Sequence, residues 1–406
     1  MQSPDAPFQR EVGVIRRALR SLNPAGPEAG AAELDWSTID GAALGRLVRW
    51  HRCGPLMHWA FGRAEAPAPP PALLDEWRRA THATVARNAF LGVKLEELAG
   101  ILAEAGIEFL VLKGPVLEAA VYAPLGCPRP YDDLDILVKP GSFLAARRLL
   151  VRHGYGLRVP LNDTEAAAQM RAGWDCGLDA PGGGLIVELC TGVAPAYLLP
   201  ARRVDLWPDS AAVTLPGGER VRAPSPARHL FALILHGTKH LWSRLIWTGD
   251  LTGLAGQLGE EDWRLLFRMA RAAGAARMVL TGLRLAADAG CGPLPTLYAQ
   301  SAARDSQAAR LARSLRARLD AGAASEPRGR EELLFLLRVR ERLRDRARHL
   351  ARLALTPSYS DWRAVRLPGP LFFLYGAIRP LRLLIHAVRS ARRRNRTCPK
   401  KTESKI

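Results

Sequence analysis

Two aspartates separated by one residue, Asp133 and Asp135, are the residues of this 406-residue chain that point most directly to a chemical function. They begin an apolar run that ends at Val138. Side chains alternate between the two faces of a strand, so both carboxylates are expected on one face, close together. Two such carboxylates repel each other unless a positive charge lies between them. The candidate is a hard divalent cation such as Mg²⁺, which takes oxygen ligands and accompanies nucleotide phosphates.

A third carboxylate, Glu188, lies inside the apolar run 185–190, where an unpaired carboxylate would be costly. On a neighbouring strand that faces the two aspartates, it would complete a metal site. The alternative is a structural residue that forms a salt bridge with Lys113 or Arg129.

The elements that must position these side chains follow from short-range patterns. Alternating or continuous apolar runs, with turns rich in Gly and Pro, predict strands at 109–112, 134–138 and 155–159, helices at 115–122 and 142–152, and a hairpin over 173–192 that turns at 181–184. Apolar residues at helical spacing predict helices within 30–64, 72–105, 226–290 and 300–350. A proline-rich linker is expected at 66–72.

These patterns predict an α+β fold, with a small mixed β-sheet core between helical regions. The expected divisions are an N-terminal helical region at 1–89, the core at 90–215, a C-terminal helical domain at 216–355, and a basic amphipathic segment with a disordered tail at 356–406.

The net charge of +19 belongs almost entirely to the C-terminal part. Residues 301–406 carry 26 Lys and Arg against 9 Asp and Glu, a net of +17, so the core shows no sign of a nucleic-acid groove. The basic segment has two readings: a packed helix with a basic exposed face, or a binding element for an anionic partner, either a membrane surface or RNA.

Compartment signals favour the cytoplasm. The six cysteines are scattered without CxxC spacing, which argues against a disulfide framework or a zinc ribbon. The N-terminus shows no secretory signal, and the apolar stretch 367–378 is too short to cross a membrane, which takes ~20 apolar residues.

The order of these motifs resembles the nucleotidyltransferase fold of the DNA polymerase β superfamily, and more narrowly a bacterial family of uncharacterised nucleotidyltransferases. The matching residues are Leu112-Lys113-Gly114, Val121-Tyr122, Arg129 and Asp133-Leu134-Asp135-Ile136-Leu137-Val138. Outside the core, 51–61 and 233–251 are similar to the N-terminal and C-terminal helical elements of that family.

The resemblance implies transfer of NMP from an NTP such as ATP to an acceptor hydroxyl, with release of pyrophosphate. It implies that Asp133 and Asp135 bind Mg²⁺, while Glu188 helps to hold a second metal ion or deprotonates the acceptor. Lys113 and Gly114 in the first turn, Arg129 as a bidentate clamp, and Lys239 or Arg244 beside the pocket are then expected to contact the phosphates. Asp250 is expected to orient Lys239 or Arg244. The acceptor stays open among a small metabolite, a protein side chain and a tRNA end.

Two departures from the superfamily pattern keep other functions open. The first turn reads Lys113-Gly114-Pro115 where Gly-Ser is usual, and Pro115 cannot donate a hydrogen bond. Glu188 is followed by Leu-Cys where Leu-His is common. The alternatives are a catalytically inactive binding module that keeps the fold, and an RNA-binding protein that uses the basic C-terminal region.

Overall fold

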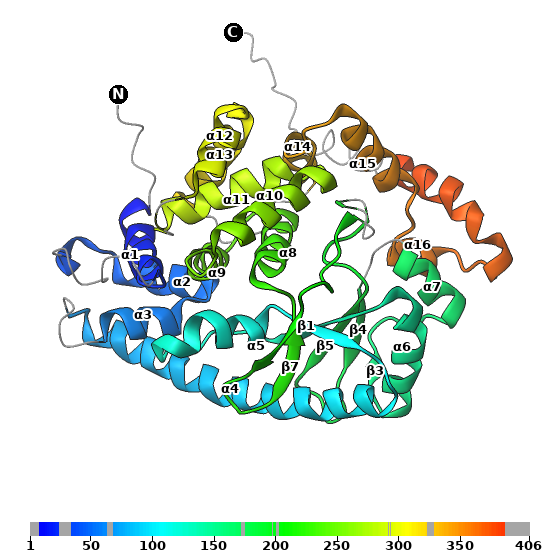
Figure 1. Cartoon of the computed structure of the whole chain (residues 1–406), viewed down its shortest axis with the longest axis horizontal. Coiled ribbons are helices and arrows are strands. Elements are labelled where there is room, and N and C mark those ends of the chain that lie inside the picture. The colour runs from blue at the N-terminus through cyan, green and yellow to red at the C-terminus, as the bar shows by residue number, and fades with distance from the viewer. Residues whose placement is uncertain are drawn as a thin grey trace, which may run out of the picture.

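The computed structural model describes residues 8–23, 34–62, 68–171, 175–196, 198–199, 203–290, 292, 294–322 and 329–385. Within these ranges a five-stranded sheet lies between a long helix on one side and a group of helices on the other (Figure 1).

The N-terminal elements are helical, as apolar spacing predicts for those within 30–64 and 72–105. They are α1 (Gln9–Arg20), η1 (Trp36–Thr38), α2 (Gly41–His51), α3 (Gly54–Phe61) and α4 (Pro71–Glu104). Asp40 caps α2 by accepting a hydrogen bond from the Ala43 N–H at 2.9 Å. That helix ends where Arg52 adopts a left-handed conformation, with φ 59°.

The sheet has the order β1-β2-β5-β4-β3. Its strands are β1 (Phe109–Leu112), β2 (Asp133–Val138), β3 (Gly156–Leu157), β4 (Cys176–Asp179) and β5 (Ile186–Cys190). Only β2 and β5 pair in parallel, so the sheet is mixed. A separate hairpin is formed by β6 (Ala211–Thr214) and β7 (Arg220–Ala223). The connecting elements are α5 (Gly114–Leu117), the π-helical turn η2 (Glu118–Tyr122), η3 (Ala123–Leu125), η4 (Pro140–Ser142), α6 (Phe143–Arg152) and α7 (Asp163–Arg171).

The C-terminal part is helical. It comprises α8 (Pro226–Lys239), α9 (Leu245–Ala255), α10 (Glu260–Ala273), α11 (Ala276–Asp288), α12 (Thr296–Ala303), α13 (Ser306–Asp320), α14 (Arg330–Arg338), α15 (Leu343–Leu355), α16 (Tyr359–Ala364) and η6 (Gly369–Leu374). Helical turns continue over 375–385. The described helices include none that is both long and apolar enough to cross a membrane.

The two faces of the sheet have different neighbours. Leu134, Ile136 and Val187 on one face pack into a core with apolar residues of α4 and α6. On the opposite face, Leu137 and Cys190 continue into a small cluster with Ala232 of α8. Because side chains alternate along a strand, Asp133, Asp135 and Glu188 lie on this second face, toward α8. The fold therefore directs the acidic side chains into the space between the sheet and the C-terminal helices.

The α+β architecture is confirmed, and so are the main elements of the core. Sequence patterns missed α1, α7 and the β6–β7 hairpin. The strands of that hairpin are four residues each, and β7 alternates Arg with Val and Ala, a pattern too short to separate from a polar loop. Of the expected divisions, 89/90 falls inside α4 and 215/216 falls in the turn between β6 and β7. The tail beyond 385 and residues 66–67 of the expected linker lie outside the described residues. The last two residues of that linker, 71–72, instead begin α4, because proline is tolerated in the first turn of a helix.

Candidate functional site

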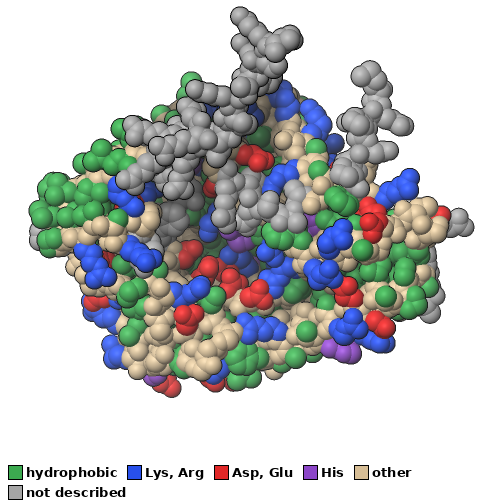
Figure 2. All heavy atoms as spheres, turned by 180° about the vertical axis from the view of Figure 1, so that it is seen from behind, with side chains coloured by type: hydrophobic (Ala, Val, Ile, Leu, Met, Phe, Trp, Pro, Cys, Tyr) green, Lys and Arg blue, Asp and Glu red, His purple; other side chains and the backbone are tan. Residues whose placement is uncertain are grey.

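A cavity of about 260 Å³ lies between the acidic face of the sheet and the helices α8 and α9. All eight residues that the sequence singles out line it: Lys113, Gly114, Arg129, Asp133, Asp135, Glu188, Lys239 and Arg244. On the face shown in Figure 2, acidic side chains gather with Lys, Arg and His near the hollowed centre of the molecule. Residues up to 131 positions apart in the chain thus meet at one place.

The strand register brings the carboxylates together. Asp135 lies directly opposite Glu188 in the parallel pair β2–β5, and Asp133 lies two residues earlier on the same face. Burial, and after it the charge of Asp135, raises the pKa of Glu188 to about 7. The same two causes raise the pKa of Asp133. The carboxylates therefore repel one another in a partly dry environment.

A fourth carboxylate, Asp175, belongs to this group, although sequence patterns did not single it out. It precedes β4, and Gly177, two residues later, lies opposite Glu188, so Asp175 projects from the same face. Its Oδ2 lies 3.9 Å from Nζ of Lys239. Burial raises the pKa of Asp175, against the opposing effect of Lys239 and Lys113. The signal was available, because the turn at 181–184 sets the register of the hairpin and places Asp175 on that face.

Lys113 supplies positive charge to the carboxylates. Its Nζ donates a hydrogen bond to Oδ1 of Asp135 at 2.6 Å. Burial lowers the pKa of Lys113, but Asp135 and the other carboxylates outweigh it and hold the pKa above its ordinary value. The backbone of Lys113 is strained, with φ 54° and ψ −131°. Its N–H donates to Nε2 of His229 at 3.1 Å, which anchors the first turn against α8.

His229 can accept this bond because it is neutral. The imidazole is 2 % exposed, and burial, with the charges of Arg129 and Lys113, lowers its pKa to about 3. Further along α8, His236 and His240 lie against the ring of Trp247, with ring centroids 5.1 Å and 5.6 Å away. His236, His240 and Trp247 line the cavity, whereas Trp242 is buried in the helical core. The face of α8 that carries His236 and His240 thus lies beside the cavity.

Arg129 is already held by another carboxylate. Its Nε and Nη2 donate to the two oxygens of Asp250 at 2.7 and 2.6 Å, and the Tyr122 hydroxyl donates to Asp250 at 2.7 Å. Asp250 therefore orients Arg129, whereas the sequence predicted Lys239 or Arg244 as its partner. Arg129 forms no ion pair with Glu188 among the described residues, so that alternative partner is wrong. Its role as a phosphate clamp stays a prediction, now restricted to the donors that Asp250 leaves available.

The N-terminal element around residue 51 supports the rim of the cavity. Nδ1 of His51 accepts a hydrogen bond from the Leu245 N–H at 3.2 Å, and Nε1 of Trp50 donates to the Ser243 carbonyl at 3.1 Å. These bonds hold the start of α9, where Arg244 lies with its guanidinium carbon 5.2 Å from the Trp50 ring centroid. Arg52 also lines the cavity and binds Asp132, the residue before β2. Sequence patterns did not single out Arg52.

The carboxylates of the cavity have the chemistry that the implied Mg²⁺ requires. The oxygens of Asp133, Asp135 and Glu188 are the hard ligands that this ion prefers. Burial, and after it the charge of Asp135, raises the pKa of Asp133 and of Glu188, and a cation between these carboxylates would reduce their repulsion. The chemistry fits a divalent cation. In the described part of the chain, however, no three His, Cys, Asp or Glu side chains are already arranged to hold a metal, and Lys113 occupies one oxygen of Asp135.

Comparison with known proteins agrees with the geometry. The model of a family described as uncharacterised nucleotidyltransferase matches residues 37–289, which is more than half of the chain. The match begins near the helices that support the rim and ends at α11, so it includes every residue that lines the cavity. No curated protein matches the chain significantly. The chain belongs to the uncharacterised nucleotidyltransferase family.

Proposed function

We propose that this protein transfers a nucleoside monophosphate from a nucleoside triphosphate to an acceptor hydroxyl. The observation that carries the proposal is the pairing of three carboxylates with Lys113, Lys239 and Arg244 around one cavity, in a chain of a nucleotidyltransferase family. A triphosphate needs positive charge along its length, and the transfer needs anionic groups at the α-phosphate to organise a cation.

The residues of the chain divide between these tasks. Asp133, Asp135 and Glu188 would hold Mg²⁺, which when bound neutralises phosphate charge and orients the reacting phosphoryl group. Lys239 and Arg244 stand on the opposite wall, from α8 and the start of α9, where they can contact phosphate oxygens. The Trp247 ring, beside His236 and His240, offers an aromatic face for the base.

Lys113 has a dual role in this proposal. In the protein alone, its ammonium donates a hydrogen bond to Asp135 and holds the carboxylates together. When a nucleotide and its cation arrive, the ammonium can turn from Asp135 to the phosphates, because a lysine binds phosphate as a mobile point charge. The hydrogen bond from its N–H to His229 would keep the first turn in place during this change. If Glu188 does not bind the cation, it is suited to accept the proton of the acceptor hydroxyl near neutral pH, because burial and the charge of Asp135 raise its pKa to about 7.

The decisive experiment incubates the protein with labelled NTPs, Mg²⁺ and a cell extract, and looks for a labelled product. Asp133→Asn and Asp135→Asn should each reduce labelling by roughly 100-fold or more, as loss of an electrostatic catalytic group typically does. Asp179→Asn, an exposed aspartate at the other end of β4, is the matched control and should keep full activity.

Calorimetry separates the enzyme from an inactive binding module. The enzyme should bind at least one NTP in a Mg²⁺-dependent manner and should lose this binding in the Asp133→Asn/Asp135→Asn double variant. Metal-dependent binding without any labelled product would favour the inactive module. If the wild-type protein and the double variant bind all four NTPs equally weakly, the proposal fails.

The C-terminal segment supports a second activity, and we infer that it binds an anionic membrane surface. Phe373 and Leu384 are 74 % and 62 % exposed, and the exposed Arg363 and Arg366 lie near them in sequence. Figure 2 shows hydrophobic side chains gathered at the end of the molecule where these C-terminal helices lie in Figure 1. Exposed apolar side chains beside arginines suit a lipid surface better than RNA, which requires charge without the apolar part.

Vesicle sedimentation tests this second proposal. The protein should bind vesicles that contain phosphatidylserine and not vesicles of phosphatidylcholine alone, and Phe373→Ser should weaken the binding. Phe90→Ser, which removes an exposed phenylalanine elsewhere, should not. Salt-sensitive retention of RNA, with no preference for anionic vesicles, would instead identify an RNA-binding segment.

A further inference from the structure

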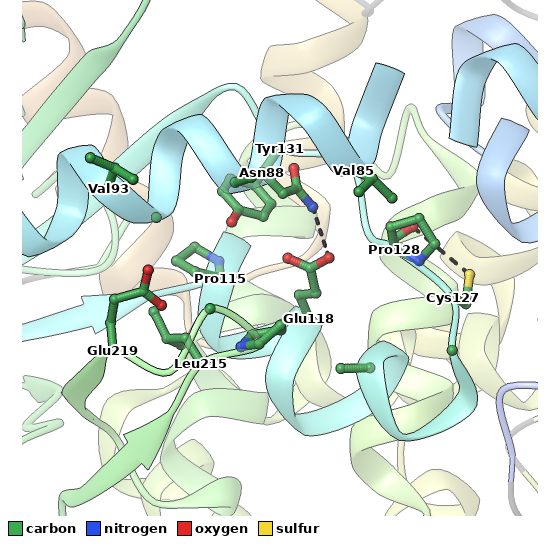
Figure 3. Close-up of a pocket in the computed structure, with 16 residues that line it drawn as sticks. Val85, Asn88, Val93, Pro115, Glu118, Cys127, Pro128, Tyr131, Leu215 and Glu219 are labelled. Atoms are coloured by element: carbon green, nitrogen blue, oxygen red, sulfur yellow. Dashed lines mark hydrogen bonds between the residues drawn. The ribbon is translucent and has the colours of Figure 1, made fainter. Parts of the chain in front are cut away.

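A second cavity, of about 510 Å³, lies beside the first and has no part in the function proposed above. Its walls come from α4, from the segment 115–131 that follows the first turn, and from the turn 215–219 between β6 and β7 (Figure 3). This volume lies within the range of ~300–1,000 Å³ that is typical of small-molecule pockets.

The second cavity differs from the first in charge. Two carboxylates, Glu118 and Glu219, lie on its walls, and none of its lining residues, all within the described chain, is Lys, Arg or His. The rest of the lining is mainly apolar and includes Val85, Val93, Pro115 and Leu215, with the ring of Tyr131. A phosphate or a carboxylate would meet repulsion here, whereas a cation with an apolar part would not.

Asn88 of α4 presents an unsatisfied acceptor at this cavity. Its Nδ2 donates to Oε1 of Glu118 at 2.8 Å and to the Arg129 carbonyl at 2.9 Å, so both of its hydrogens are used. Its Oδ1 is buried and has no partner among the described residues, and the residue is only 8 % exposed. Figure 3 shows Asn88 reaching toward Glu118, with Tyr131 beside it. A buried acceptor without a donor is costly, and a ligand that donates would remove the cost.

Glu118 also lacks a cation. It is 6 % exposed and accepts hydrogen bonds from Asn88 and, at 3.4 Å, from the Arg129 N–H. It forms no ion pair among the described residues, because the neighbouring guanidinium of Arg129 is bound to Asp250. Burial raises the pKa of Glu118 above its ordinary value. A carboxylate in such surroundings is stabilised when a positive charge comes within hydrogen-bonding distance.

We propose that this cavity binds a small organic cation, a protonated amine carried on an apolar body. The ammonium would donate a hydrogen bond to Glu118 and, after the Asn88 side chain turns, to its buried Oδ1, and the body would lie against the apolar walls. Tyr131 lines both cavities, and its ring covers Gly114, where an added Cβ would lie 3.0 Å from Cγ of the tyrosine. The bound amine would therefore lie next to the first turn of the nucleotide site.

Three probes of similar shape test the chemistry: phenethylamine, phenethyl alcohol and phenylacetate. Each is titrated into the full-length protein at pH 7 without nucleotide or metal, and binding is measured by ligand-observed NMR. The amine should bind at least about tenfold more tightly than the alcohol, because it adds charge-assisted hydrogen bonds, and phenylacetate should not bind. An amine that does not bind, or that binds no better than the alcohol, would overturn the proposal.

Two variants locate the binding. Glu118→Gln keeps the shape of the side chain and removes its charge, so amine affinity should fall about tenfold. Ala89→Trp fills the cavity from an exposed position of α4 and should abolish binding even if the first variant folds poorly. Their controls, Glu96→Gln and Ala83→Trp, lie at exposed positions of α4 outside the cavity and should bind normally. Amine binding that survives Ala89→Trp would also overturn the proposal. No nucleotide is present, so failure here leaves the proposed function untouched.

Discussion

At the scale of single residues, the site depends on which charges are paired. The ammonium of Lys113 lies among several carboxylates, and Asp250 accepts two hydrogen bonds from Arg129 at the edge of the same cavity. The first pair is partly accessible and can exchange its partner when a ligand binds. The second pair is buried, with both side chains less than a tenth exposed, and it holds the 129–131 turn that leads into β2.

We expect Asp250→Asn to destabilise the protein by about 3 kcal/mol, because it leaves the buried guanidinium of Arg129 without its countercharge. Tyr122→Phe removes only one hydrogen bond to the same carboxylate and should cost about 1 kcal/mol. Urea unfolding of both variants gives the free energies. Equal losses would show that the Arg129–Asp250 charge pair does not dominate this contact.

At the scale of elements, two glycines allow α9 to pack closely against η2 and α1. A Cβ at Gly253 would lie 2.0 Å from Cγ1 of Val121, and one at Gly249 would lie 2.5 Å from Cδ2 of Leu19. The two glycines are four residues apart, on one face of the helix. This face packs against η2 and α1, so it places Asp250 within reach of Arg129.

Gly253→Ala should therefore destabilise the protein by about 1–3 kcal/mol through overpacking against Val121. Gly100→Ala is a suitable comparison, since it lies in α4 with no atom within 4 Å of its added Cβ. That change should stabilise the protein by about 0.5–1 kcal/mol, as alanine does in an open helical position. Thermal unfolding measures both shifts, and a neutral Gly253→Ala would contradict the close approach.

At the scale of the whole molecule, buried histidines join segments that are distant in sequence. His51 links the N-terminal helices to the start of α9, and His229 links α8 to the first turn. Burial, with nearby arginine or lysine charge, lowers the pKa of each to about 3. The folded protein excludes the proton that the unfolded chain takes up near pH 6.5, so stability from these residues is lost as the pH falls from 6.5 toward 3.

A variant with a group that cannot titrate should reveal this effect. Carboxylates with raised pKa values, such as Glu188, act with the opposite sign, so the variant must be compared with the wild type at each pH. Relative to the wild type, His51→Gln should gain stability as the pH falls from 6.5 to 5, by up to about 1.4 kcal/mol per pH unit. Urea unfolding at several pH values measures the difference. A difference that does not change with pH would show that His51 has the same pKa in the folded protein as in the unfolded chain.

Short-range patterns were sufficient for much of the fold and of the site. Apolar runs at 109–112 and 134–138 and the glycine-rich turn at 181–184 predicted the strands and the hairpin, because strand periodicity and turn chemistry act between near neighbours. The same periodicity predicted that Asp133 and Asp135 share a face. It failed for α1, α7 and the β6–β7 hairpin, where the segments are short or strongly charged.

The sequence by itself identified eight candidate residues that the structure places around one cavity. Only the tertiary structure decided how their charges are paired. Lys113 binds Asp135 across 22 positions and Arg129 binds Asp250 across 121, and Asp175 joins the carboxylates through the register of β4. Pairing of this kind depends on the packing of helices against the sheet, and no local pattern encodes it, because ion pairs form between whichever charges the fold brings within a few ångströms.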